Sequence, residues 1–242
     1  MGLMYQIPVV TANQLTAEEV ARLAQDRDTG QDSQAEMRMR LYDRQGRVRE
    51  RTMTFLTRHE TGNTKDRILV RFTYPNDIRN TALLVWEHPD AEDERFLFLP
   101  ALGRVRRITG AEKQESFVGS DLSYEDIGGR NVADYTYQFV EEDAAWVAPD
   151  GASHPAWRIE AVGKDQKMNY PRSVSTILKE QLVLVHADIY NHRDEQAKIF
   201  EVTRLDQISG IWTVTALVMV DKSEQTRTEL ETLSIEYNVG LT

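Results

Sequence analysis

The sequence contains no cysteine, so it can form neither a disulfide framework nor a thiolate metal site. It also lacks any apolar run approaching the ~18 residues that a membrane-spanning helix needs. No internal repeat, low-complexity tract or linker divides it. With 242 residues, of which 40% are hydrophobic and 28% charged, the chain suits one large soluble domain or two small ones.

Two further absences concern compartment and partners. The start of the chain, Met1 to Pro8, has neither a basic end nor a long apolar centre, so no secretory signal peptide is visible. The formal net charge of -10 argues against nonspecific nucleic-acid binding, because such binding depends on neutralising phosphates. We therefore predict no nucleic-acid partner, although an acidic surface still allows a local basic patch.

Motifs for catalysis and metal binding are missing as well. Gly119-Ser120-Asp121 does not fit the G-x-S-x-G pattern of a serine nucleophile. Gly128-Gly129 lacks the G-x-G-x-x-G frame of a phosphate-binding loop. Five histidines occur, and none has a partner at metal-ligand spacing: His59, His88, His154, His186 and His192. The sequence therefore predicts no enzymatic activity, no metal and no cofactor.

What the chain does contain is a long series of alternating segments typical of β-strands. Their residue ranges are 35–42, 48–57, 67–74, 81–87, 96–99, 104–108, 134–140, 157–162, 182–190, 197–205, 212–221 and 226–237. Segment 174–178 fits a further strand, but residues 172–178 could instead be helical. Segment 81–87, which contains Leu83, Leu84, Val85 and Trp86, is predicted to be buried on both faces.

One helix is predicted ahead of the strands, from Leu15 to Asp26. Thr16 and Glu19 form a T-x-x-E capping box at its start. Val20 and Leu23 lie on one apolar face, which should pack into the sheet or across its mouth. So many strands cannot stay flat, because sheets twist and long ones curl. The curl leaves a concave apolar face that helices must fill or line.

The most informative stretch spans residues 96–130. An apolar run at 96–99 leads to a basic segment at 104–108 and then to a polar loop. Residues 117–127 follow as a predicted short helix with Ser120 or Asp121 as its cap. The apolar side chains there are too many for one solvated turn, so something should cover them.

The same stretch resembles a known family. LPALGRVRRI at 99–108, followed by SFVGSDLSYEDI at 116–127, is similar to the signature of LolA-like outer-membrane lipoprotein-sorting proteins. It resembles more narrowly the branch found beside lipid-exporting membrane transporters. The resemblance covers the central third strongly and the flanking strand pattern loosely.

The resemblance implies a mainly β fold with a few helices (α+β). A curved antiparallel sheet would form an incomplete β-barrel, with helices covering the concave face around a hydrophobic cavity. It implies a single half-barrel domain at 15–242 after an N-terminal extension at 1–14. It also implies a periplasmic location, with the secretory signal already removed.

Two sets of candidate site residues follow. Those predicted to line or close the cavity are Trp86, Phe98, Leu99, Phe117, Leu122, Tyr124 and Ile127. For several of them, ordinary core packing is the alternative. Arg104, Arg106 and Arg107 either contact an anionic headgroup or an acidic partner, or form a solvated hairpin arm.

Three functions remain open at this point. The first is a periplasmic carrier or chaperone that binds a lipid or lipoprotein acyl chain for transfer towards the outer membrane. Such binding needs apolar volume and no reactive group. The second is a non-catalytic interaction module that docks on an inner-membrane lipid transporter. The third is a hydrolase with a lipid-like substrate, which would require a Ser or Asp within reach of a histidine in a cleft.

Overall fold

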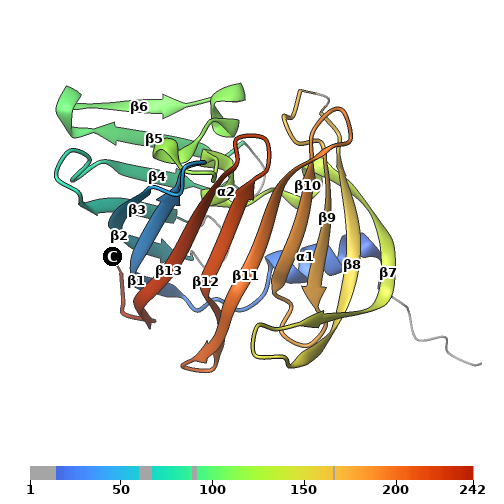
Figure 1. Cartoon of the computed structure of the whole chain (residues 1–242). Helices are drawn as coiled ribbons and strands as arrows, with labels where there is room; N and C mark the ends of the chain where they lie inside the picture. The colour runs from blue at the N-terminus through green and yellow to red at the C-terminus, as the bar shows by residue number, and fades with distance from the viewer. Residues whose placement is uncertain (1–14, 60–66, 89–91, 166, 242) are drawn as a thin grey trace, which may run out of the picture.

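Thirteen antiparallel strands form one sheet in the computed structural model, in the order β6-β5-β4-β3-β2-β1-β13-β12-β11-β10-β9-β8-β7 (Figure 1). The structure describes residues 15–59, 67–88, 92–165 and 167–241, so the predicted extension at 1–14 lies outside the described residues. The strands are β1 (Asp32–Tyr42), β2 (Val48–Arg58), β3 (Arg67–Tyr74), β4 (Ala82–Trp86), β5 (Glu94–Leu99), β6 (Arg104–Ile108), β7 (Tyr135–Val147), β8 (Ser153–Gly163), β9 (Arg172–Leu178), β10 (Leu184–Tyr190), β11 (Gln196–Ile208), β12 (Ile211–Asp221) and β13 (Thr226–Tyr237).

The connectivity is a meander interrupted once. Strands that follow one another in sequence pair, except β6 and β7, and β1 also pairs with β13 and so joins the N-terminal and C-terminal groups of strands. β6 and β7 are the two edges, and the sheet is not closed. The mainly β, antiparallel, incomplete-barrel prediction is confirmed. The helical alternative for 172–178 is wrong, because these residues form β9, between β8 and β10.

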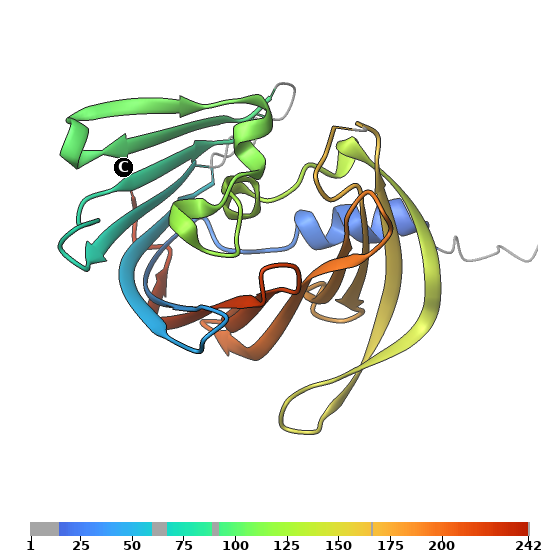
Figure 2. The ribbon, with the colours of Figure 1, turned by 45° about the horizontal axis from the view of Figure 1, so that its top comes forward.

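Helical elements are few and short. They are α1 (Ala17–Gln25), α2 (Tyr124–Gly128) and four 3-10 turns, η1 (Pro100–Leu102), η2 (Gly110–Gln114), η3 (Phe117–Gly119) and η4 (Val132–Asp134). Figure 2 shows the sheet curving around α1 and around the segment that carries α2. None of the helices in the described part of the chain has the length and apolar character needed to cross a bilayer.

The α1 helix begins as its sequence predicts. The Thr16 N–H donates to Glu19 Oε2 at 2.7 Å, and the Glu19 N–H donates to Thr16 Oγ1 at 3.2 Å, which completes the capping box. Val20 is fully buried, but Leu23 is 40% exposed, so the prediction that Leu23 packs onto the sheet is wrong. Ala17 and Ala21 flank Val20 on the buried face instead, because their small side chains let the helix approach closely.

The interior consists of three apolar clusters that touch. The largest joins β1–β6 and β10–β13, the second lies among β7–β12, and the third lies under α1. Phe200 packs against the first and second, and Leu184 packs against the first and third. In β4, Leu83 and Val85 are fully buried while Leu84 and Trp86 are only partly buried. The prediction that residues 81–87 are buried on both faces is therefore wrong.

Candidate functional site

Residues 110–129 lie inside the curve of the sheet, and we call them the inner segment (Figure 2). They contain η2, η3 and α2, which are joined by short turns. The α2 helix begins at Ser123, whose hydroxyl accepts from the Asp126 N–H at 3.1 Å. The Asp126 carboxylate accepts in return from the Ser123 N–H at 2.8 Å. The predicted cap at Ser120 or Asp121 is therefore wrong, because the capping box that satisfies the first free N–H groups lies further along the chain.

The inner segment fills the largest apolar cluster with its own side chains. Phe117, Leu122 and Tyr124 are exposed by 0%, 5% and 6%. The Phe117 ring stacks on Phe72 of β3 with centroids 5.6 Å apart, and Tyr124 meets it edge-on at 5.7 Å. Such offset and edge-to-face pairs stabilise by about 0.5–1.5 kcal/mol beyond area burial. These side chains therefore occupy the space that an empty half-barrel would leave open.

Three cationic side chains from the sheet hold backbone carbonyls of the inner segment. Arg51 of β2 donates from Nη1 to the Val118 carbonyl, and Arg95 of β5 donates from Nε to the Tyr124 carbonyl at 3.3 Å. Lys198 of β11 donates from Nζ to the Asp121 carbonyl at 2.7 Å. Charge-assisted bonds of this kind are stronger than neutral ones. The segment is thus bound at three points on three different strands.

Asp121 adds a fourth point of attachment. Its carboxylate accepts from the hydroxyls of Thr226 and Thr228 on β13, the latter at 2.6 Å, and its N–H donates to Thr228 Oγ1 at 2.9 Å. Thr228 is fully buried. A buried carboxylate–hydroxyl network is stable only when its members have partners, and every partner here requires the segment to be in place.

Arg51 is an unusual residue to find in this core. It is only 8% exposed, and no carboxylate within the described residues lies at ion-pair distance from it. Burial lowers the pKa of Arg51, and the charge of Arg49 adds to the effect. Its guanidinium also lies 5.8 Å from the centroid of the Phe72 ring. A buried cation that depends on one carbonyl is costly to leave without that carbonyl.

The backbone is strained at the residue that Arg51 binds. Val118 has φ +50° and ψ +36°, a left-handed conformation that is rare for a β-branched residue. Gly128 permits the close docking of α2, because a Cβ there would lie 2.8 Å from Val85 Cγ1 and 2.9 Å from Arg95 Nη2. Strained backbone persists only where its surroundings impose it, and here Arg51 and the core do so.

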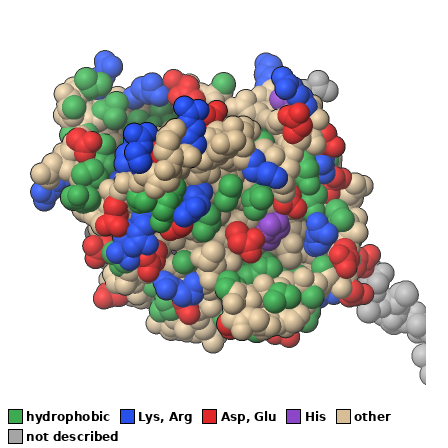
Figure 3. Space-filling view, viewed as in Figure 1, with side chains coloured by type: hydrophobic (Ala, Val, Ile, Leu, Met, Phe, Trp, Pro, Cys, Tyr) green, Lys and Arg blue, Asp and Glu red, His purple; other side chains and the backbone are tan. Residues whose placement is uncertain are grey.

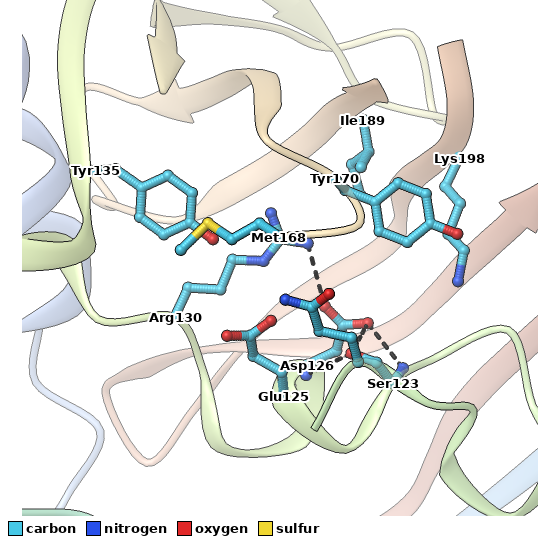
Figure 4. A pocket seen from close by; sticks show the side chains of 10 residues that line it. Ser123, Glu125, Asp126, Arg130, Tyr135, Met168, Tyr170, Ile189 and Lys198 are labelled. Atoms are coloured by element: carbon cyan, nitrogen blue, oxygen red, sulfur yellow. Dashed lines mark hydrogen bonds and ion pairs between the residues drawn. The ribbon is translucent and has the colours of Figure 1, made fainter. Parts of the chain in front are cut away.

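A small polar pocket lies beside α2 (Figure 4). Its free volume of about 10 Å³ is roughly that of one water molecule. Asp126 Oδ1 accepts from Arg130 Nη2 at 3.4 Å. Burial raises the pKa of Glu125, and the positive charge of Arg130 partly offsets this rise. Tyr170 and Lys198 line the opposite side, with the Lys198 Nζ 5.1 Å from the Tyr170 ring centroid. This pocket is too small for an acyl chain.

The predicted site residues divide between the two faces of the sheet. Leu99, Phe117, Leu122, Tyr124 and Ile127 come together in the largest cluster. Trp86 and Phe98 do not join them, because they alternate with the core residues of β4 and β5 and so lie on the outer face.

The basic residues divide in the same way. Arg104 and Arg106 pair across the strands with Leu99 and Leu97, and so lie on the inner face at the rim, where Arg106 meets Glu112 at 3.6 Å. Arg107 pairs across with Phe96 on the outer face and meets Glu94 at 2.9 Å.

Sequence reasoning missed the residues that hold the inner segment. Arg51 shares a strand face with Met53, and Arg95 shares one with Leu97, so each arginine stands where the alternation calls for an apolar side chain. An arginine at a strand position that faces the core is unusual, and this pattern could have indicated a buried arginine with a specific partner. No comparable signal marks Lys198 or Asp121. Within the described ranges, no group of three or more His, Asp or Glu side chains could hold a metal ion.

Comparison with known proteins agrees with this architecture. A family model described as "Uncharacterized protein" matches residues 64–242. A DUF1329 family protein from Desulfovibrio piger is 31% identical, with a TM-score of 0.82 over 93% of each chain. A domain assigned to an outer membrane lipoprotein-sorting protein of Vibrio parahaemolyticus is 25% identical, with a TM-score of 0.83 over 93% of this chain and 94% of that one.

A LolA superfamily protein from Nitrosomonas europaea shares the fold, with 16% identity and a TM-score of 0.69 over 95% of this chain and 96% of that one. Among curated proteins, none matches the chain.

Proposed function

This chain belongs to the DUF1329 family and has a LolA-like fold, and we propose that it is a periplasmic carrier for a lipid or lipoprotein acyl chain. The carrier would shield the chain from water during transfer towards the outer membrane. The proposed role is non-catalytic. The observation that carries it is the inner segment, whose apolar side chains fill the half-barrel while polar ties hold its backbone.

An incoming acyl chain would take the places of Phe117, Leu122 and Tyr124. Each buried methylene of the ligand contributes about 0.8 kcal/mol, which offsets the apolar contacts that the segment loses. Because one apolar group replaces another, the free-energy difference between the closed and loaded states stays small. A carrier that must both load and unload needs such a balance.

The lining of this cluster suits ligands of variable shape. Of the seven methionines in the chain, Met39, Met53 and Met219 are buried in the cluster, and Met37 packs against it. Methionine side chains are unbranched and adapt to irregular space. Together with Leu99 they would close around an acyl chain without a fixed pattern of pockets.

The helical elements and the rim complete the proposed cavity. In this scheme α1 and the inner segment cover the concave face, and residues 15–242 act as one half-barrel domain. Arg104 and Arg106 lie on the inner face of the edge strand β6, where an anionic headgroup would emerge. Arg107, Trp86 and Phe98 lie on the other face and would not contact the same ligand.

A second candidate function is favoured by the filled interior. If Phe117 and its neighbours never leave the core, the chain would act as a non-catalytic module that docks on a lipid-exporting membrane transporter. The outer faces of the strands would then supply the contacts.

The deciding experiment measures binding of a fluorescent fatty acid by wild type and by Leu122→Asp. The substitution places a carboxylate at a site that is 5% exposed, so it should weaken closure of the inner segment and change the affinity or the kinetics of the probe. Val147→Asp, at a side chain that is 64% exposed, is the control. If wild type binds no probe and no co-purifying lipid, and Leu122→Asp changes only stability, the docking module replaces the carrier.

A further inference from the structure

The outer face of β2–β6 carries a continuous apolar surface. Leu56, Leu69, Leu84 and Phe96 stand opposite one another on successive strands and form a row across the sheet. Trp86, Phe98 and Val105 extend this row on the same face. We call these seven side chains the outer stripe. None of them belongs to the core clusters, and Val105 is 60% exposed.

No helix of the described chain packs on the outer stripe, and the loop after β4 covers one end of it, where His88 stacks on Trp86 with ring centroids 5.4 Å apart. The helical segments lie on the other side of these strands, inside the curve (Figure 2). In Figure 3, hydrophobic side chains lie at the upper left, where the ends of these strands are, among side chains of Lys, Arg, Asp and Glu. Leu102, at the tip of the β5–β6 hairpin, is 58% exposed next to this surface.

The charges on this face oppose the charge of the whole protein. The face carries four arginines, namely Arg58, Arg67, Arg71 and Arg107. The face also carries two acidic residues, Glu50 of β2 and Glu94 of β5. Glu50 is paired with Arg40 at 3.2 Å, and Glu94 is paired with Arg107 at 2.9 Å and faces His88 at 3.3 Å. The chain as a whole has a net charge of -10, so a basic and apolar face is a local exception.

We propose that the outer stripe docks the protein on an anionic phospholipid surface. Guanidinium groups match phosphate geometry, and half-buried aromatic side chains suit the boundary between headgroups and acyl chains. The Arg67 guanidinium lies 4.5 Å from the centroid of the Trp86 ring, which combines both features at one place. The face is a broad surface that spans five neighbouring strands, and so it fits an extended lipid surface better than a single helix.

This docking goes beyond carriage of an acyl chain, because it uses the opposite face of the sheet. The protein could then rest on a leaflet while the inner segment stays free to move. Since the remaining surface is acidic, attraction operates only at short range, within the screening length of about 10 Å at 0.1 M salt. Binding should therefore weaken as ionic strength rises.

The test is co-sedimentation of the full chain with vesicles of phosphatidylcholine alone or with added phosphatidylglycerol. The stripe variant is Arg71→Glu with Val105→Glu, two exposed positions that should not disturb folding. The control is Arg193→Glu with Val147→Glu, which makes the same charge change at exposed positions elsewhere. Thermal unfolding of both double variants should match wild type.

Wild type should bind the anionic vesicles and not the neutral ones, and the stripe variant should bind about tenfold more weakly. The control variant and Leu122→Asp should bind as wild type does, which separates docking from acyl-chain uptake. The proposal is overturned if wild type binds no vesicle, or if both double variants lose binding equally. It is also overturned if light scattering shows that wild type and the control variant are dimers while the stripe variant is a monomer. The outer stripe would then bind a second copy of the chain instead of a membrane.

Discussion

The two halves of the curved sheet hold their inner elements by different kinds of contact. Beside β7–β9, α1 docks through Ala17, Val20 and Ala21 against an apolar cluster. Within the described residues, the side-chain hydrogen bonds of α1 all stay inside the helix and its cap. Beside β2–β5, the inner segment also buries apolar groups, but Arg51, Arg95 and Lys198 hold its carbonyls as well.

This difference suggests that α1 stays in place inside the sheet, whereas a ligand can displace the inner segment. The contact surface of α1 consists of small apolar side chains that pack closely. If α1 moved away, water could not replace these apolar contacts with hydrogen bonds. Hydrogen bonds to backbone carbonyls can be remade with water or with a ligand when a segment lifts. The strained Val118 backbone would also relax on release. We therefore expect the inner segment to open and α1 to stay.

The largest effect should come from Phe117→Ala. Removing this fully buried ring costs about 3–5 kcal/mol of closure free energy. Hydrogen exchange of residues 110–129 should accelerate strongly while exchange in α1 and β13 changes little. The matched change, Val20→Ala in α1, should instead lower the midpoint of global thermal unfolding. Equal acceleration in both regions would show that the two halves unfold as one unit.

Arg51→Met should have the next largest effect. The variant keeps an apolar stem but loses the bond to the Val118 carbonyl, which should weaken closure by about 1–3 kcal/mol. Acyl-probe association should become faster, because the segment opens more often. Arg49→Met, on the same strand but exposed, should behave as wild type. Slower probe binding in Arg51→Met would contradict a closing role for Arg51.

A pair of cap substitutions makes the same chemical change in both regions. Ser123→Ala removes the cap of α2 and Thr16→Ala removes the cap of α1, each costing about 1 kcal/mol. Only Ser123→Ala should alter the kinetics of probe binding, since only α2 belongs to the inner segment. Stopped-flow fluorescence on both variants tests this. The comparison between the halves fails if Thr16→Ala changes the kinetics to the same extent.

The smallest effect should be a pH dependence at Glu125. Burial raises the pKa of Glu125, so its carboxylate ionises less readily in the folded state than in the unfolded chain. This group's stabilising contribution is complete below its unfolded pKa and is lost as pH rises through its raised folded pKa. Glu125→Gln should therefore gain stability relative to wild type at neutral pH but not in acid. Thermal unfolding at both pH values, with exposed Glu142→Gln as control, measures it.

Strand content was predictable because alternation is a local signal. The bounds of β3, β6 and β13 match their predicted ranges, and the capping box of α1 formed as its T-x-x-E pattern indicates. Side-chain partners across long distances were not predictable. Leu23 fits the apolar face by periodicity, yet the close approach of Ala17 and Ala21 leaves it exposed. Sequence periodicity does not say how near two elements come.

By itself, the sequence determined which residues form strands, where the chain turns and that residues 117–127 need apolar cover. These properties depend on neighbours in the chain, through backbone preference and the two-residue period of a strand. Only the tertiary structure decided that Trp86 and Phe98 lie on the face opposite Phe117, and that Arg51 reaches the Val118 carbonyl. Such contacts depend on the sign of the sheet's curvature and on pairing between distant strands, which no local pattern encodes.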